Sequence, residues 1–196
     1  MIVIGLTGSV GMGKSTAAAF LKCMGLPVHD ADRTVHRLMA KGGAAVAAVE
    51  AAFPGVVCDG AVDRRLLGAR VFGRGAEMKR LEAILHPMVR RAERRFLERC
   101  RSRRLPIAVL DIPLLYETGG EKRCDLVIVL TAPQFLQDQR VLRRSGMSPQ
   151  RLAEIKAKQM PDVEKRKRAD IVINTGIDFR HTRTALFHAT RKLKHR

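Results

Sequence analysis

A glycine-rich stretch close to the N-terminus limits the fold more than any other feature of this chain. Residues 8–15 read Gly-Ser-Val-Gly-Met-Gly-Lys-Ser and fit the phosphate-binding loop pattern G-x-x-x-x-G-K-[ST] at every fixed position. An apolar run at residues 2–6 precedes the stretch, and strong helix formers follow from Thr16 onward. Because this strand–loop–helix order is the context that the motif requires, we predict an α/β fold that binds a nucleoside triphosphate.

The residue types of this loop match the chemistry of polyphosphate binding. Glycines let the backbone turn so that its N–H groups converge on phosphate oxygens at the start of a helix. Lys14 would reach the β- and γ-phosphates as a mobile charge, and the Ser15 hydroxyl would bind Mg²⁺. We therefore expect nucleotide contacts from Gly8, Gly11, Met12, Gly13, Lys14, Ser15 and Thr16.

Five apolar runs alternate with helical segments along the rest of the chain. The runs that read as strands are 2–6, 27–29, 107–111, 126–130 and 170–174. This alternation predicts a mainly parallel five-stranded sheet within one domain. The sheet core would comprise residues 1–33, 105–134 and 169–196.

Two helical and basic segments interrupt the predicted core. Residues 34–104 read as an arm, with a loop at 56–61, a helix at 78–85 and a new helix that starts at His86-Pro87. Residues 135–168 carry several arginines and a turn with glycine and proline. Such a basic segment is typical of a lid that closes over phosphates.

Carboxylates lie at two of the predicted strand ends. Asp30 and Asp32 come directly after the second strand, and Asp111 ends the third. In open α/β sheets, ligands bind at the carboxyl edge, so these groups are candidate functional residues. For Asp30, the cap of a following helix is an equally good interpretation. For Asp32 we favour a functional role, and Asp111 resembles the acid of the second nucleotide-binding motif, which reaches Mg²⁺ directly or through water.

The composition restricts the class of protein and its partners. The net charge of +18 implies affinity for anions, or else a solvated basic surface. The chain has no tryptophan and a single tyrosine, which argues against a surface that stacks nucleic-acid bases. No apolar run is long enough to span a membrane, and Met1 leads straight into the first strand, so we expect a cytoplasmic protein. The four scattered cysteines predict free thiols.

Several motifs, in order along nearly the whole chain, resemble those of the dephospho-coenzyme A kinase family. They follow the phosphate loop and are Asp30-Ala31-Asp32, Arg64-Arg65 with Leu67, His86-Pro87, Pro113-Leu114-Leu115-Tyr116-Glu117, Gln159, and Ala169-Asp170-Ile171-Val172-Ile173. The family usually has Phe where Tyr116 stands. Many members also have Asp-Asn before the glycine where this chain has Asn174-Thr175, so the residues that contact adenine are not predicted.

The resemblance implies a three-layer P-loop kinase fold with a helical substrate arm and a lid. It also implies transfer of the γ-phosphoryl group of ATP, with Mg²⁺, to the 3′-hydroxyl of dephospho-coenzyme A. Asp32 would orient or deprotonate that hydroxyl, while Lys14 and Arg140 would act on the transferred group. Arg144 would contact ATP with the lid. Candidate acceptor contacts are Asp32, Arg65, His86 and Leu115, and candidate metal ligands are Ser15 and Asp111.

Other functions remain alternatives at this stage. A nucleoside or nucleoside monophosphate kinase would use the same fold. A nucleic-acid-binding protein regulated by the loop would show binding with a steep salt dependence, although the shortage of aromatic residues speaks against it. His86 has a second interpretation, a local hydrogen bond at a helix start. We expect ATP and dephospho-coenzyme A as partners, neither nucleic acid nor membrane, and a monomer or weak homo-oligomer.

Overall fold

The computed structural model describes residues 1–194 and groups them into two compact units. The first unit comprises Met1–His29 and Cys100–Arg196, of which the last two residues lie outside the described part. The second unit is Asp30–Arg99, close in extent to the predicted arm at 34–104. The predicted lid at 135–168 belongs to the first unit.

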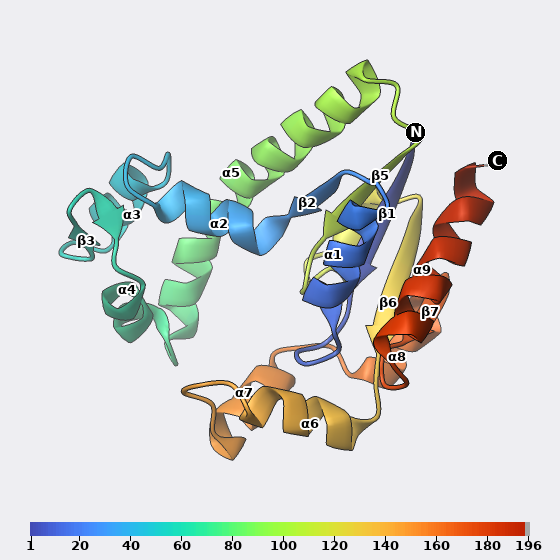
Figure 1. The fold of residues 1–196 in the computed structure, drawn as a ribbon. Coiled ribbons are helices and arrows are strands. Elements are labelled where there is room, and N and C mark those ends of the chain that lie inside the picture. The colour runs from blue at the N-terminus through green and yellow to red at the C-terminus, as the bar shows by residue number, and fades with distance from the viewer. Residues whose placement is uncertain (195–196) are drawn as a thin grey trace. The chain divides into compact units, whose positions relative to one another are not determined.

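The first unit contains a five-stranded sheet (Figure 1). Its strands are β1 (Ile2–Thr7), β2 (Val28–Asp30), β5 (Ile107–Asp111), β6 (Leu126–Thr131) and β7 (Ile171–Asn174), in the spatial order β2-β5-β1-β6-β7. The pairs β1–β5, β1–β6 and β6–β7 are parallel. The predicted five-stranded parallel α/β fold is confirmed.

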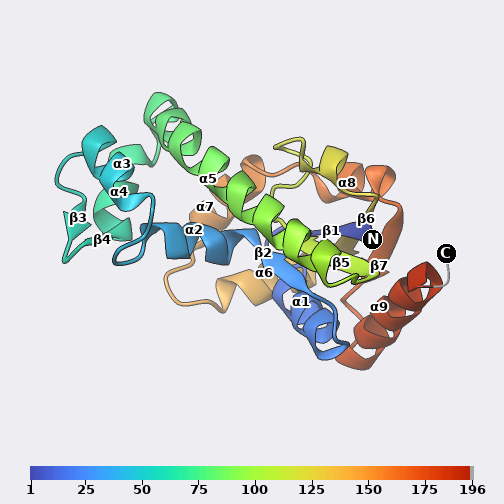
Figure 2. The ribbon, with the colours of Figure 1, turned by 90° about the horizontal axis from the view of Figure 1, so that it is seen from above.

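Helices cover both faces of this sheet. The helices of the first unit are α1 (Lys14–Cys23), α6 (Gln134–Leu142), α7 (Pro149–Ala157), α8 (Asp162–Arg168) and α9 (Phe179–Lys194), with a 3₁₀ turn η1 (Gly120–Arg123). Helices α1 and α9 pack together on one face, while α8 packs against β6 on the other (Figure 2). The fully buried side chains of Ile4, Leu21 and Leu186 contribute to the core between the sheet and the α1–α9 layer. In three-layer folds of this kind, ligands bind at the carboxyl ends of the strands, and the phosphate loop follows β1 at that edge.

The second unit has its own apolar core. Its elements are α2 (Ala31–Met39), α3 (Val46–Ala52), β3 (Val57–Cys58), β4 (Ala61–Val62), α4 (Arg64–Val71) and most of α5 (Gly75–Ser102). Val49, Phe53 and Leu67 are buried in one cluster with side chains of α5. An independent core explains why this segment forms a compact unit.

Two local predictions for this unit are wrong. Residues 56–61 are not a plain loop, because β3 and β4 form a small hairpin around Asp59-Gly60. Both turn residues have positive φ values, 50° and 77°, as a tight two-residue hairpin turn requires. The helix at 78–85 also does not end before His86. Helix α5 continues through Pro87, because Leu85 before the proline and Met88 after it pack against the same apolar cluster, which outweighs the single backbone hydrogen bond that proline removes.

Candidate active site

The phosphate loop between β1 and α1 has glycine where its backbone geometry requires one. Gly11 and Gly13 have φ values of 78° and 77°, which side chains rarely tolerate. A Cβ atom on Gly8 would lie 2.8 Å from the carbonyl oxygen of Leu130 in β6. The sequence pattern therefore coincides with positions where the backbone needs glycine.

The turn that follows β7 holds this loop from one side. The Thr175 hydroxyl donates a hydrogen bond of 3.1 Å to the backbone oxygen of Met12. A Cβ atom on Gly13 would lie 3.1 Å from that hydroxyl oxygen, so the two segments pack closely. The loop geometry thus depends on the segment after β7 as well as on its own glycines.

Lys14 is paired with Asp111 at the carboxyl edge of the sheet. Its Nζ donates to Asp111 Oδ1 at 2.7 Å, and the Asp111 side chain is only 4% exposed. In the parallel β1–β5 register, Asp111 stands beside Leu6, just before the loop begins. The strand pairing therefore delivers a carboxylate to the lysine that the motif assigns to phosphate.

The two candidate metal ligands are both oxygen donors. Ser15 lies exposed in the first turn of α1, and Asp111 is buried at the end of β5. Among residues 1–194, no group of three or more His, Cys, Asp and Glu side chains could hold a metal by itself. One hydroxyl and one carboxylate fit a hard cation that takes its other ligands from phosphate and water, which is how Mg²⁺ binds in kinases.

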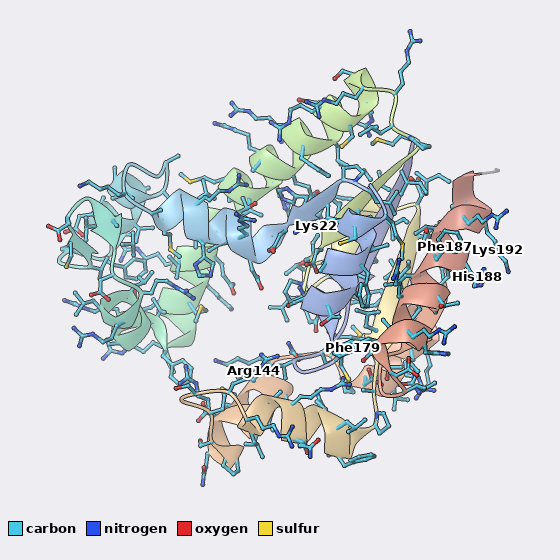
Figure 3. All side chains as sticks on the ribbon, in the orientation of Figure 1. Lys22, Arg144, Phe179, Phe187, His188 and Lys192 are labelled. Carbon is cyan, nitrogen blue, oxygen red and sulfur yellow. The ribbon has the colours of Figure 1, made fainter. Side chains whose placement is uncertain are left out.

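Arg140 of α6 reaches the phosphate loop. Its guanidinium donates to the Thr175 carbonyl oxygen at 2.8 Å and to the Thr175 hydroxyl at 3.2 Å. A third contact, of 3.4 Å, goes to the backbone oxygen of Gly11. Arg144, beyond the end of α6, is exposed (Figure 3). The structure therefore brings Arg140, but not the Arg144 guanidinium, into hydrogen-bonding contact with the loop.

The predicted acceptor residues at the start of the arm lie in the second unit. Asp30 Oδ1 accepts a hydrogen bond of 2.8 Å from the backbone N–H of Arg33, so its role as the cap of α2 is confirmed. Asp32 follows in the first turn of the same helix, with its side chain exposed. The catalytic role of Asp32 stays a prediction.

Arg65 and His86 are also exposed residues of the second unit. Arg65 lies in the first turn of α4, which Asp63 caps by accepting hydrogen bonds from the backbone N–H groups of Leu66 and Arg65. These two hydrogen bonds lower the pKa of the Asp63 carboxyl. His86 lies inside α5, so it does not begin a helix. Contacts from Arg65 and His86 to the acceptor stay predictions.

Leu115 is a core residue. Its side chain is fully buried, and a Cβ atom on Gly5 would lie 2.9 Å from its Cδ2. Because the side chain fills space beside β1, a direct contact of Leu115 with the acceptor would have to come from its backbone. The next residue, Tyr116, is 7% exposed, and burial together with the charges of Asp170 and Glu121 raises its pKa to about 12.

The structural role of Lys165 could not be predicted from the sequence. It belongs to the basic run at 165–168, yet its side chain is fully buried in α8. Its Nζ lies 2.9 Å from Glu117 Oε1, which also accepts a 2.7 Å hydrogen bond from the Met160 backbone. Glu117 thus joins the Pro-Leu-Leu-Tyr-Glu motif to the end of the predicted lid. Nothing in the run itself distinguishes Lys165 from its exposed neighbours.

A cavity of about 730 Å³ opens beside the phosphate loop. Its walls include Ser9 and Met12 of the loop, residues at the ends of β6 and β7, and one side of α8. Gln137 of α6 and Gln159, just after α7, also line it. The volume is in the range of small-molecule sites. No helix among the described residues is long and apolar enough to cross a membrane.

Known proteins are similar to this chain in both sequence and fold. A dephospho-CoA kinase of Paramagnetospirillum magneticum is 68% identical over 166 residues, which cover 85% of this chain and 78% of that protein. A dephospho-CoA kinase of Rhodospirillum rubrum is 57% identical over 187 residues, covering 94% and 88% of the two chains.

Solved structures agree with these relatives. A Thermus thermophilus protein solved under the name TT1252 superimposes with a TM-score of 0.85 at 38% identity, covering 98% of this chain and 97% of that one. A dephospho-CoA kinase from Campylobacter jejuni has the same fold, with a TM-score of 0.67 at 22% identity over 97% and 96% of the chains. The family model for dephospho-CoA kinase matches residues 2–178. The chain therefore belongs to the dephospho-CoA kinase family.

Proposed function

We propose that this protein transfers the γ-phosphoryl group of ATP to the 3′-hydroxyl of dephospho-coenzyme A, giving coenzyme A and ADP. The observation that carries the proposal is the phosphate loop with Lys14 beside Asp111, in a chain that belongs to this family. Both substrates are polyanions, which suits a net charge of +18. The size of that charge beyond the needs of the site has no explanation in the structure.

The donor half of the reaction is assigned to the loop. Its backbone N–H groups and the start of α1 would bind the phosphate oxygens of ATP. Lys14 would exchange its contact with Asp111 for the β- and γ-phosphates. Ser15 and the released Asp111 carboxylate would then hold Mg²⁺, which neutralises charge on the phosphates when bound. Positioning and charge neutralisation supply most of the catalysis in phosphoryl transfer.

The acceptor half is assigned to the second unit. Asp32 would orient the 3′-hydroxyl and accept its proton, which suits an exposed carboxylate on the first turn of a helix. Arg65 and His86 would bind the phosphates of dephospho-coenzyme A. Arg140 and Arg144 would neutralise charge on the transferred group as the segment 135–168 closes. The guanidinium of Arg140 already lies at the loop, which supports its part in this scheme.

A panel of acceptors tests this function. ADP release from ATP and Mg²⁺ is measured with dephospho-coenzyme A, nucleosides, nucleoside monophosphates and no acceptor. Among these acceptors, we expect only dephospho-coenzyme A to give saturable ADP release. Saturable release with a nucleoside or nucleoside monophosphate instead would support the alternative kinase, and replacing Mg²⁺ by Ca²⁺ tests the metal assignment.

We further propose that the protein works in the cytoplasm as a monomer or weak homo-oligomer. Four free cysteines support a reducing compartment. Light scattering across a concentration series measures the oligomeric state, and a concentration-independent dimer or larger assembly would contradict the proposal.

A further inference from the structure

Both backbone polar groups of one residue of the phosphate loop, Val10, are hydrogen-bonded to glutamine side chains. Gln137 Nε2 donates a hydrogen bond of 2.8 Å to the backbone oxygen of Val10. The backbone N–H of Val10 donates one of 3.0 Å to Gln159 Oε1. Val10 is the residue before Gly11, at the outer turn of the loop, so these two bonds act on the backbone that shapes the phosphate site.

The two glutamines flank the segment 143–158 within the predicted lid. Gln137 lies in α6, before the segment 143–158, and Gln159 follows α7, after it. Helices α6 and α7 pack together, and Lys156 of α7 forms an ion pair with Asp138 of α6. Both ends of the lid segment are therefore attached to the same residue of the loop.

The backbone of α6 also lies against the loop itself. A Cβ atom on Gly11 would lie 2.7 Å from Val141 Cγ2 and 2.9 Å from the backbone oxygen of Gln137. Gln137 is only 6% exposed, so its side chain is confined at this contact. A movement of α6 must consequently move the loop, or break the contact with Val10.

We propose that Gln137 and Gln159 are positioning residues for nucleotide binding. They fix the two peptide groups that flank the Val10 Cα atom, keep the neighbouring N–H groups of the loop directed at phosphate, and transmit the position of the lid to the loop. They touch no phosphate themselves. The inference deepens the proposed function, on which it rests, because it takes the ligand of the loop to be ATP.

The two hydrogen bonds have opposite polarity, so the same charged residue can be introduced at each position and the two variants compared. The effect of the added charge on ATP binding then cancels in the comparison. Glutamate at 159 keeps an acceptor for the Val10 N–H, whereas glutamate at 137 turns an acceptor toward the Val10 oxygen. Lysine at 137 keeps a donor for that oxygen, whereas lysine at 159 turns a donor toward the N–H. Each pair adds the same charge next to the same residue, Val10, and the cavity that both glutamines line leaves room for the new side chains.

The experiment measures the dissociation constant of ATP for Gln137→Glu, Gln159→Glu, Gln137→Lys and Gln159→Lys by calorimetry, with thermal unfolding of each variant. Gln159→Glu should bind ATP about fivefold more tightly than Gln137→Glu, the factor that one net hydrogen bond supplies. Gln137→Lys should bind more tightly than Gln159→Lys by a similar factor. Where one variant fails to fold, the pair of the other charge makes the same comparison.

A purely structural role would give a different result. It would change the unfolding temperature, but the order of ATP affinities at positions 137 and 159 would not reverse between the glutamate pair and the lysine pair. Equal ATP affinities within each charge pair would overturn the inference. The KM for ATP in the acceptor assay should follow the dissociation constants, while kcat changes less. The unmodified protein separates the two proposals: if it binds ATP but releases no ADP with dephospho-coenzyme A, the proposed function fails and the binding comparison is still decisive.

Discussion

Lys14 Nζ lies 2.7 Å from Asp111 Oδ1, so the lysine of the phosphate loop is neutralised by a carboxylate of the neighbouring strand. Both side chains are largely buried, at 16% and 4% exposure. The pair holds the lysine at the site and compensates the charge of a buried carboxylate. In the proposed function, Lys14 exchanges this contact for the β- and γ-phosphates when ATP binds.

Replacing Lys14 tests its assignment to phosphate. Lys14→Met should lower kcat by about 10²- to 10³-fold, because a preorganised charge on the transferred group is lost. Lys22→Met is the control, since Lys22 lies exposed in the last turn of the same helix (Figure 3). Steady-state ADP release measures both variants. Equal activity of the two would contradict the role of Lys14.

Two glycines with nearly the same φ value allow the energetic cost of backbone strain to be measured apart from the cost of steric crowding. Gly11 and Gly25 have φ values of 78° and 79°, but a Cβ atom on Gly25 meets nothing within 4 Å. Gly25→Ala should cost about 1 kcal/mol of unfolding free energy from its left-handed backbone, with ATP binding unchanged. Gly11→Ala should cost about 1–3 kcal/mol more and weaken ATP binding, because it pushes α6 from the loop. Urea unfolding and ATP titration measure both, and similar losses would refute the crowding argument.

Tyr116 is expected to make the free energy of unfolding fall as the pH rises into the alkaline range. Burial and nearby acids raise its pKa to about 12, above the value of about 10 in an unfolded chain. The folded state therefore favours the neutral phenol, and this stabilisation is complete below pH 10 and is lost as the pH rises to about 12. Tyr116→Phe should lose less stability over that range than the unmodified protein.

The ultraviolet absorbance of tyrosinate checks this prediction directly. Tyr116 is the single tyrosine of the chain, so the titration reports one group. A midpoint near pH 12 in the folded protein is expected. A midpoint near pH 10 with the fold intact would show that burial does not hold the phenol neutral.

Replacing Asp32 tests the acceptor half of the site. Asp32→Asn should lower kcat by about 10²- to 10⁴-fold, the usual contribution of a general base, with the affinity for ATP retained. Asp59→Asn is a matched control, because Asp59 is an exposed carboxylate of the same unit and asparagine tolerates its positive φ. Normal turnover by Asp32→Asn would remove the carboxylate from the mechanism.

The parallel sheet and the loop could be predicted because local and global signals agree there. The apolar run 107–111 coincides with β5 throughout, and the glycines of the loop stand where the backbone has positive φ or no room for a side chain. A segment can be predicted from its sequence when the local pattern and the tertiary structure agree in this way. The arm was predicted less accurately, because tertiary packing keeps α5 helical through Pro87, although a proline usually interrupts a helix.

The supporting contacts of the site could not be predicted. Thr175, Gln137 and Lys165 lie between 35 and 163 residues from partners that they hold, such as Arg140 and Met12. Side chains of these types are usually solvated on a surface, and only the folded chain shows which of them meet a backbone or a carboxylate. Lys14–Asp111 is intermediate: both residues were candidates, but their pairing follows from the strand register.

The identity of the phosphorylated product tests the central claim most directly. Phosphorus NMR of a reaction with ATP, Mg²⁺ and dephospho-coenzyme A should show ADP and a new 3′-phosphate monoester of coenzyme A appearing in equal amounts. Omitting dephospho-coenzyme A should stop ADP formation. Formation of ADP with inorganic phosphate, or transfer of phosphate to a nucleoside monophosphate in preference to dephospho-coenzyme A, would contradict the account.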